Sequence, residues 1–270
     1  MKTITALAEL LHRRTKVLAY HGVEPAPQSE YDVGVEEFAA QLAYLAANGF
    51  VVLPLEQFVA GLADGGLPER SVAITFDDGL ASVRRHALPL LEQFGFAATV
   101  FLPTAWIDAR SAGNDGLPPH IARLMTWSEI ADAAGRGLAF GGHSASHRSL
   151  RILGARELSA ETAGCRDTLR ARIGGGFMPF AYPYGAFDPT TMAAVEDAGF
   201  ACAFSFGDVL GNSRLTPRFA LRRESVLRTT ALSGFAAKLD PGNDLRRKLG
   251  TLLARRGRRA ARPTKEARVE

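Results

Sequence analysis

The sequence predicts an α/β fold, a distorted (β/α) barrel of about seven parallel strands. Three observations predict it. Short β-branched and apolar runs alternate with segments of helical periodicity, the alternation gives seven or eight strands, and glycines end several helices directly before the next strand. An open, doubly wound sheet is the structural alternative. No Gly-x-Gly-x-x-Gly pattern follows the first strand, which disfavours a dinucleotide-binding version of that sheet.

The expected strands are apolar and β-branched runs bounded by turn residues, at 17–20, 51–53, 71–76, 98–102, 138–140, 180–182, 201–204 and 220–226. The expected helices repeat apolar residues every three or four positions, at 35–48, 55–63, 83–94, 127–134, 156–173 and 189–198. Gly49, Gly95 and Gly199 stand where a left-handed cap usually ends a helix. The irregular stretch 105–125 is long enough to overhang a site.

The charge pattern divides the chain into a catalytic domain, 1–242, and a basic helix and tail, 243–270. The tail contains ten Lys/Arg and three Asp/Glu, whereas the rest contains 22 and 25, so the pI of 9.3 arises from the tail. The body is therefore not expected to bind nucleic acid. Leucines at helical spacing among the basic residues predict that 244–262 contacts an anionic membrane. Leucines packed on the barrel and a solvated basic end are the alternative.

A cytoplasmic location is expected, with a possible peripheral place at the inner face of the membrane. Glu9 interrupts the apolar residues 3–11, and a basic cluster follows them, whereas it precedes the apolar run in a secretory signal. No apolar stretch approaches the roughly 20 residues that span a membrane. Cys165 and Cys202 lie far apart without metal-binding spacing, so both are expected to be reduced and buried.

Polar residues cluster where the expected strands end, which is the catalytic face of a barrel. Asp77 and Asp78 directly follow the run 71–76. Two adjacent carboxylates in such a place repel one another unless a cation neutralises them, so one is expected to bind a metal while the other accepts a proton from water. A simple Asp-Gly turn is the alternative.

His143 and His147 are four residues apart, a spacing that places two imidazoles on one side of a helical turn. With one aspartate they offer two nitrogens and one oxygen to a divalent ion and leave room for water and substrate. Zinc is the expected metal, and the same donors also suit cobalt or nickel. One capped loop histidine and one packed histidine are the structural alternative.

These motifs resemble the polysaccharide deacetylases of the NodB-homology type, carbohydrate esterase family 4. The resemblance covers about residues 17–226 and rests on TFDDG at 75–79, on the two histidines and on AYPYG at 181–185, in the family's order. It implies Asp77 as the base and Asp78, His143 and His147 as metal ligands. It also implies that the backbone N–H of Tyr184 polarises the substrate carbonyl.

Two positions depart from the family pattern. Many members have an arginine, which steadies the catalytic aspartate, where this chain has Ala181. Many also take their general acid from a late histidine, and here no histidine follows His147. The chain is most similar to the subgroup acting on poly-N-acetylglucosamine adhesins, whose late motifs appear permuted to the N-terminus. That likeness implies His21 as the acid and Arg223, or Arg222, in place of the arginine.

Purely structural roles are the alternatives: His21 is then a buried histidine bonded to a carbonyl, and the two arginines form a surface pair.

The expected function is metal-dependent removal of acetyl groups from N-acetylhexosamine residues of a polysaccharide or lipid-linked glycan, in exopolysaccharide or adhesin biosynthesis. Hydrolysis of another amide, such as a formamide or cyclic imide, and a catalytically silent carbohydrate-binding module remain open. Phe101, Trp106 and Tyr182 are placed to line a sugar cleft, and packing at strand ends is the alternative for them. Trp127 is expected in the core, and His12, His86 and His120 at the surface.

Overall fold

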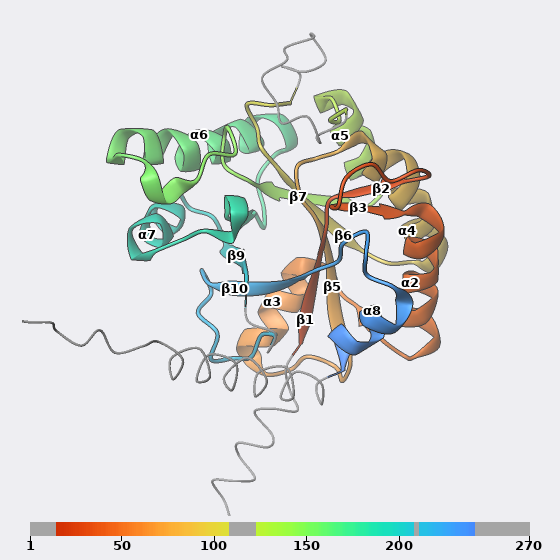
Figure 1. Ribbon diagram of the computed structural model, residues 1–270. Helices are drawn as coiled ribbons and strands as arrows, with labels where there is room; N and C mark the ends of the chain where they lie inside the picture. The colour runs from red at the N-terminus through yellow and green to blue at the C-terminus, as the bar shows by residue number, and fades with distance from the viewer. Residues whose placement is uncertain (1–14, 108–122, 208–210, 241–270) are drawn as a thin grey trace, which may run out of the picture.

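The computed structural model describes residues 15–107, 123–207 and 211–240, and these contain a closed barrel of seven parallel strands (Figure 1). The strands are β1 Lys16–Tyr20, β5 Ser71–Phe76, β6 Ala98–Leu102, β7 Leu138–Gly142, β8 Pro179–Ala181, β9 Cys202–Phe206 and β10 Leu221–Ser225. They follow one another as β1, β10, β9, β8, β7, β6 and β5, and β5 pairs with β1 to close the ring. The predicted barrel is confirmed, and the open sheet is excluded.

Three short strands lie outside the ring. β4 Val51–Val52 pairs only with the start of β5, and β2 Gly22–Glu24 pairs with β3 Asp32–Gly34 in a separate two-stranded sheet. The sequence did not predict β2 and β3, because three residues are too few to show an alternating pattern.

Helices surround the barrel, as Figure 1 shows. Their bounds are α2 Val35–Ala47, α3 Leu55–Asp64, α4 Leu88–Phe94, α5 Trp127–Gly135, α6 Ala155–Ile173, α7 Pro189–Asp197 and α8 Leu232–Leu239, with short 3₁₀ turns η2 Leu150–Ile152 and η3 Pro183–Gly185. The helix expected at 83–94 is a π turn, η1 Val83–Ala87, followed by α4. Pro89 has no N–H to donate to the carbonyl of Arg85, so a continuous α-helical ladder cannot form there.

Side chains of the barrel strands alternate between two apolar clusters. One cluster lies between the strands and the outer helices. The other joins α3 to the opposite face of the strands and includes Val17, Ala73, Phe101, Phe204 and Leu221. Because Val17, Ala73 and Leu221 stand near the beginnings of their strands, α3 closes the amino end of the barrel. The carboxyl end remains for polar side chains.

Two further expectations are confirmed. Gly49, Gly95 and Gly199 have φ of +68°, +65° and +86°, the left-handed values expected of helix caps. Cys165 and Cys202 are buried free thiols, and burial raises the pKa of each to about 12.

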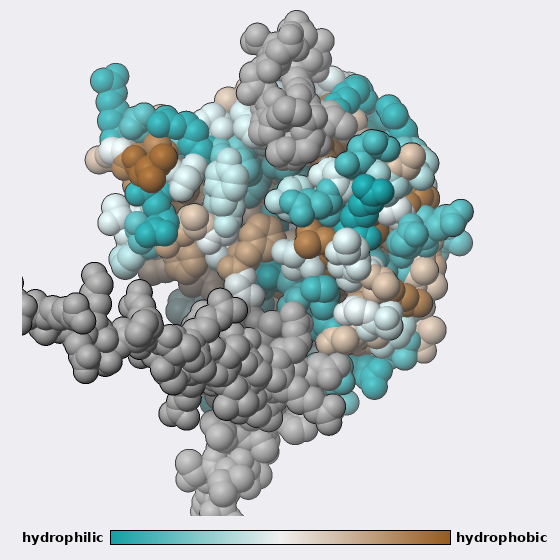
Figure 2. All heavy atoms as spheres, in the orientation of Figure 1, coloured by the Kyte–Doolittle hydropathy of each residue, from teal (hydrophilic) through white to brown (hydrophobic). Residues whose placement is uncertain are grey.

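Hydrophilic and hydrophobic residues are mixed in small patches over the described part of the face in Figure 2. Among the residues that the structure describes, no helix is long and apolar enough to cross a membrane. The basic segment 243–270 lies outside the described residues, as does most of the irregular stretch 105–125.

Candidate active site

The strand register brings polar side chains to the carboxyl end of the barrel. His21 lies four residues after Val17 and Asp77 four residues after Ala73, and both apolar residues face the barrel interior. Arg223 follows an inward-facing residue of β10 by two positions. Since alternate residues of a strand share one face, all three polar side chains point into the mouth of the barrel.

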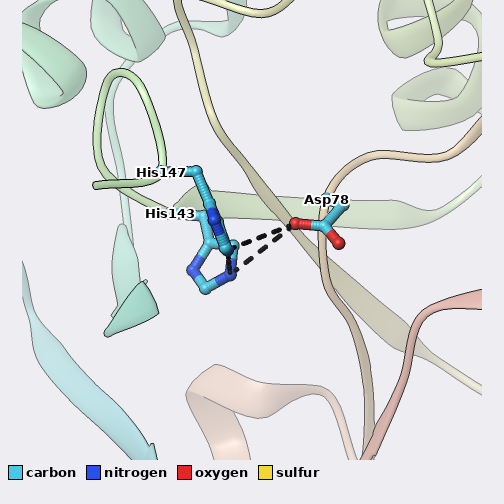
Figure 3. Close-up of side chains that lie close together, drawn as sticks. All are labelled: Asp78, His143 and His147. Atoms are coloured by element: carbon cyan, nitrogen blue, oxygen red, sulfur yellow. Dashed lines mark hydrogen bonds and ion pairs between the residues drawn. The ribbon is translucent and has the colours of Figure 1, made fainter. Parts of the chain in front are cut away.

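Asp78, His143 and His147 converge on one point (Figure 3). The two Nε2 atoms are 3.2 Å apart, and Asp78 Oδ1 lies 3.5 Å from Nε2 of His147 and 3.9 Å from Nε2 of His143. Donors held at about 2.0–2.2 Å by a tetrahedral ion are roughly 3.3–3.6 Å from one another. The three atoms are therefore spaced as ligands of a single divalent ion.

Two further observations support this ligand set. Asp78 Oδ1 is buried and has no hydrogen-bond partner within the described chain. Burial and the neighbouring Asp77 carboxylate raise the pKa of Asp78 to about 8, an electrostatic cost that a bound cation would remove. Nδ1 of His143 lies 2.7 Å from the Ala181 carbonyl oxygen, so it carries the proton and leaves the Nε2 lone pair for a metal.

The backbone is strained where these ligands attach. Asp78, Ser144, His147 and Tyr184 have φ of +68°, +62°, +56° and +60°, and Arg70 is the one other non-glycine residue of the described chain with positive φ. Each such residue costs about 1–3 kcal/mol and is typical of functional sites. The helical turn expected between the two histidines is wrong: they belong to a loop, in which Ser144 Oγ accepts the N–H of His147.

Asp77, the aspartate beside the three candidate ligands, forms a buried ion pair with Arg223. The guanidinium donates to both carboxylate oxygens, at 2.6 and 2.8 Å. Burial raises the pKa of Asp77, but the charge and hydrogen bonds of Arg223, together with His143 and His21, hold the pKa well below its usual range. The Arg223 carbon Cζ lies 5.1 Å from the ring centre of Phe101 and 4.6 Å from that of Phe206.

The alternative in which the two arginines lie at the surface is therefore wrong for Arg223, which is 2% exposed. Arg222, the other candidate, is half-buried, and its backbone N–H and carbonyl are hydrogen-bonded to the side chain of Asn212. Ala181 itself lies in the inner apolar cluster. Arg223 thus contacts the aspartate from a different strand than the one on which the family's arginine was expected.

His21 leaves β1 beside this pair. Its ring lies 4.9 Å from that of Tyr31 and is stacked at 6.5 Å from that of Phe206. Nδ1 is buried without a hydrogen-bond partner in the described ranges, so no carbonyl bond forms at that nitrogen. Burial lowers the pKa of His21 to about 4, although the Asp77 carboxylate acts in the opposite direction.

Tyr184 lies in η3 with its side chain 66% exposed and its ring 4.8 Å from that of His147. Trp106 packs against the same imidazole at 5.1 Å. Phe101 and Tyr182 are fully buried, so the expectation that they line a sugar cleft is wrong. Their position at strand ends was compatible with a cleft or with the core, and both rings pack against other aromatic side chains in the core.

The remaining expectations concern residues away from the site. Trp127 packs against the core at the start of α5, with Arg172 over its ring, as expected. His86 is half-buried, and His12 and His120 lie outside the described residues.

Sequence reasoning missed Phe206, Tyr31 and Ser144, which touch predicted site residues. Phe206 had a signal, since it lies two positions beyond the inward-facing Phe204. Tyr31 reaches His21 from the segment before β3, for which no pattern was visible.

Comparisons with known proteins agree with this geometry. The family model described as polysaccharide deacetylase matches residues 64–203, just over half of the chain. Putative polysaccharide deacetylase YxkH of Bacillus subtilis is 25% identical over 225 residues, which are 83% of this chain and 75% of the relative. Poly-beta-1,6-N-acetyl-D-glucosamine N-deacetylase of Staphylococcus epidermidis is 25% identical, over 69% of this chain and 64% of the relative, so the chain spans less than two thirds of that protein.

Solved structures give the same fold. IcaB from Ammonifex degensii is 27% identical with a TM-score of 0.70, over 84% of this chain and 97% of that one. Deacetylase PplD of Streptococcus pyogenes has a TM-score of 0.73 at 20% identity, over 84% and 99%. The matched segment 64–203 contains both aspartates of the site, both of its histidines and Tyr184. This chain therefore belongs to the polysaccharide deacetylase family, whose members are hydrolases acting on amide bonds.

Proposed function

We propose that this protein is a metal-dependent N-deacetylase acting on N-acetylglucosamine residues of a β-1,6-linked glycan, used in exopolysaccharide or adhesin biosynthesis. The observation that carries the proposal is the buried Asp78 Oδ1, which has no hydrogen-bond partner among the described residues and lies close to Nε2 of His143 and of His147, beside the Asp77–Arg223 pair. The glycan is suggested by the staphylococcal relatives, whose names specify it.

Asp78, His143 and His147 would hold the metal, for which we propose zinc, and cobalt or nickel would fit the same donors. When bound, such an ion lowers the pKa of a water molecule and polarises a carbonyl oxygen. The remaining work falls to the protein. Asp77, kept ionised and oriented by Arg223, accepts the proton of the attacking water.

Tyr184 and His21 complete the proposed reaction. The Tyr184 backbone N–H stabilises the oxyanion, a role worth about 3–4 kcal/mol for one donor in other hydrolases. His21 donates a proton to the departing amine, and the products are acetate and a free amino sugar. Burial keeps His21 neutral at pH 7 in the substrate-free protein, so this step requires negative charge to develop beside the ring and raise its pKa.

The two departures from the family pattern do not weaken the proposal. Arg223 contacts the aspartate that the absent arginine would have contacted, and His21 lies against the same cluster. A silent carbohydrate-binding module has no need of a desolvated arginine–aspartate pair beside a metal-spaced triad. The cytoplasmic location stays a proposal from sequence alone.

The deciding experiment measures acetate release from short β-1,6-linked N-acetylglucosamine oligomers, with β-1,4-linked oligomers as the comparison. The purified protein is stripped of metal and reloaded with zinc, cobalt or nickel. We expect activity only after reloading, and a preference for the β-1,6 series. Asp78→Ala and His143→Ala should lose bound metal and activity together. Asp77→Asn should keep the metal while turnover falls by at least about 100-fold.

Full activity in rigorously metal-free protein would contradict the metal site. Loss of metal from Asp77→Asn would show that the roles of the two aspartates are reversed. Binding of the oligomers without acetate release by the metal-loaded protein would favour the carbohydrate-binding module.

A further inference from the structure

Glu161 is a buried carboxylate on the core-facing side of α6. The buried positions of this helix recur at helical spacing and, apart from it, hold uncharged side chains: Leu158, Thr162, Cys165 and Leu169. Glu161 is 7% exposed. A carboxylate is costly in such a position unless hydrogen bonds compensate its lost hydration, so its contacts indicate why it is there.

Outside its helix, Glu161 is hydrogen-bonded to two consecutive residues of the loop between the metal-spaced histidines. One carboxylate oxygen accepts the backbone N–H of Ser146 at 2.8 Å, and the other accepts the Ser146 hydroxyl. The backbone carbonyl of Glu161 accepts the N–H of Ala145 at 3.1 Å. Both carboxylate oxygens are thus used on the residue directly before His147.

The loop needs external support because its conformation is unfavourable by itself. Ser144 and His147 both have left-handed backbones without being glycine. On its other side the loop is held by the segment after β6, where Thr104 and Ala105 donate to the carbonyls of Ser144 and Ala145. α6 and this segment therefore clamp the loop from two sides.

The two histidines are oriented by different means. The ring of His143 is fixed by the Ala181 carbonyl, and its backbone N–H donates to Leu102 at the end of β6. His147 lies beyond the strand, on the loop residue that follows Ser146. Its Nε2 lies 3.5 Å from Oδ1 of Asp78 (Figure 3). Keeping that distance requires the backbone of the loop to stay in place, and Glu161 is bonded to that backbone at Ser146.

We infer that Glu161 is a positioning residue that holds His147 in place for metal binding, through its two hydrogen bonds to Ser146. This role rests on the proposed metal site. It is distinct from ligation, since the Glu161 carboxylate is occupied by Ser146. Outer hydrogen-bond partners of this kind typically change metal affinity 10–100-fold, and the same range is expected here.

The test measures the zinc affinity of the full-length protein by competition with a chromophoric chelator, and the visible absorption of the cobalt-loaded protein. Glu161→Ala should weaken zinc binding about 10–100-fold and alter the cobalt spectrum. Glu161→Gln should bind nearly as wild type, because its carbonyl can accept the Ser146 N–H and its amide can donate to the hydroxyl. Glu157→Ala is the matched control: this residue is one turn earlier on α6, 53% exposed in its side chain, and pairs with Arg148 at the surface.

Ser146→Ala removes one of the two carboxylate bonds and should give an intermediate loss of affinity, which decides the matter if Glu161→Ala does not fold. Wild-type zinc affinity in Glu161→Ala or, failing that variant, in Ser146→Ala would overturn the inference. An equal loss in Glu161→Gln and Glu161→Ala would also overturn it. If the wild-type protein itself binds no zinc, the proposed function fails, and the two failures are thereby distinguished.

Discussion

Arg223 and Asp77 depend on one another because a buried charge is costly without its counter-charge. The guanidinium is fully buried between two aromatic rings, and both of its terminal nitrogens are engaged by the carboxylate. Such a pair orients the carboxylate through two bonds, which a single ammonium group could not do. The same arginine that orients the Asp77 carboxylate also lowers its pKa, so Asp77 is a weaker base than a free aspartate.

Replacing Arg223 with Ala should destabilise the protein by about 3–5 kcal/mol, because it leaves a buried carboxylate without its counter-charge. Chemical denaturation checks the stability, and turnover should fall with metal retained. Arg222→Ala is the control, and it should change stability by no more than about 0.5 kcal/mol because the backbone bonds of that residue survive. Similar stabilities of the two variants would show that the buried pair does not contribute as inferred.

His21 should make the metal-free protein sensitive to acid. Its pKa is about 4 in the folded state and near 6.5 when exposed, so between these values the unfolded chain binds more protons. Its contribution to stability is therefore full above about pH 6.5 and is lost as the pH falls toward 4. In His21→Ala the decline in unfolding free energy over this window should be shallower, as urea unfolding at several pH values would reveal.

The same variant examines the proposed proton donation. With metal retained, His21→Ala should flatten the basic limb of the pH–rate profile. An unchanged profile would remove His21 from the mechanism, whatever the stability measurements give.

At the scale of elements, the strands orient the site residues at their ends, and the loops after the strands set the distances between the others. Asp77 and His143 directly follow β5 and β7, whereas Asp78, His147 and Tyr184 have left-handed backbones in the segments after the strands. Gly185 is part of this arrangement. A Cβ there would lie 2.7 Å from the backbone nitrogen of Phe206, the residue that stacks on Arg223.

Gly185→Ala should reduce activity strongly, because η3 must move and take the Tyr184 N–H with it. Gly95→Ala is a closely matched control: both glycines have φ of +65°, but a Cβ at Gly95 meets open space. The control should lose about 1 kcal/mol of stability from backbone strain and keep its activity. Thermal unfolding together with acetate release separates the two effects, and equal activities would show that the position of η3 is unimportant.

At the scale of the whole molecule, the basic segment 244–262 is predicted to contact an anionic membrane, with about 1 kcal/mol of attraction for each basic residue near the surface. Co-sedimentation with anionic vesicles at physiological salt measures this directly. The full-length protein should bind more strongly than a form truncated before Asn243. Equal binding by the two forms would mean that the segment has no membrane role and that its leucines serve another purpose.

The barrel, its strands and the two motifs that supply the proposed metal ligands could be predicted from the sequence. These features depend on local sequence. Apolar periodicity indicates each helix and strand, and the carboxyl ends of parallel strands lie at one end of a barrel however the side chains pack. Asp77, Asp78, His143 and His147 could be named for this reason. A π turn in place of a helix, and strands of three residues, escaped prediction because they are exceptions to the periodicity.

Contacts between residues far apart in the sequence became visible in the folded structure. Arg223 pairs with Asp77 across 146 positions of sequence, and closure of β1 on β5 brings His21 to the same place. The choice of Arg223 over Arg222 depended on which residue faces inward in β10, and a shift of one residue would have reversed it. The loop between the two histidines is likewise held by distant residues, Glu161 of α6 and the segment after β6, and their contacts could not be read from the five residues of the loop itself.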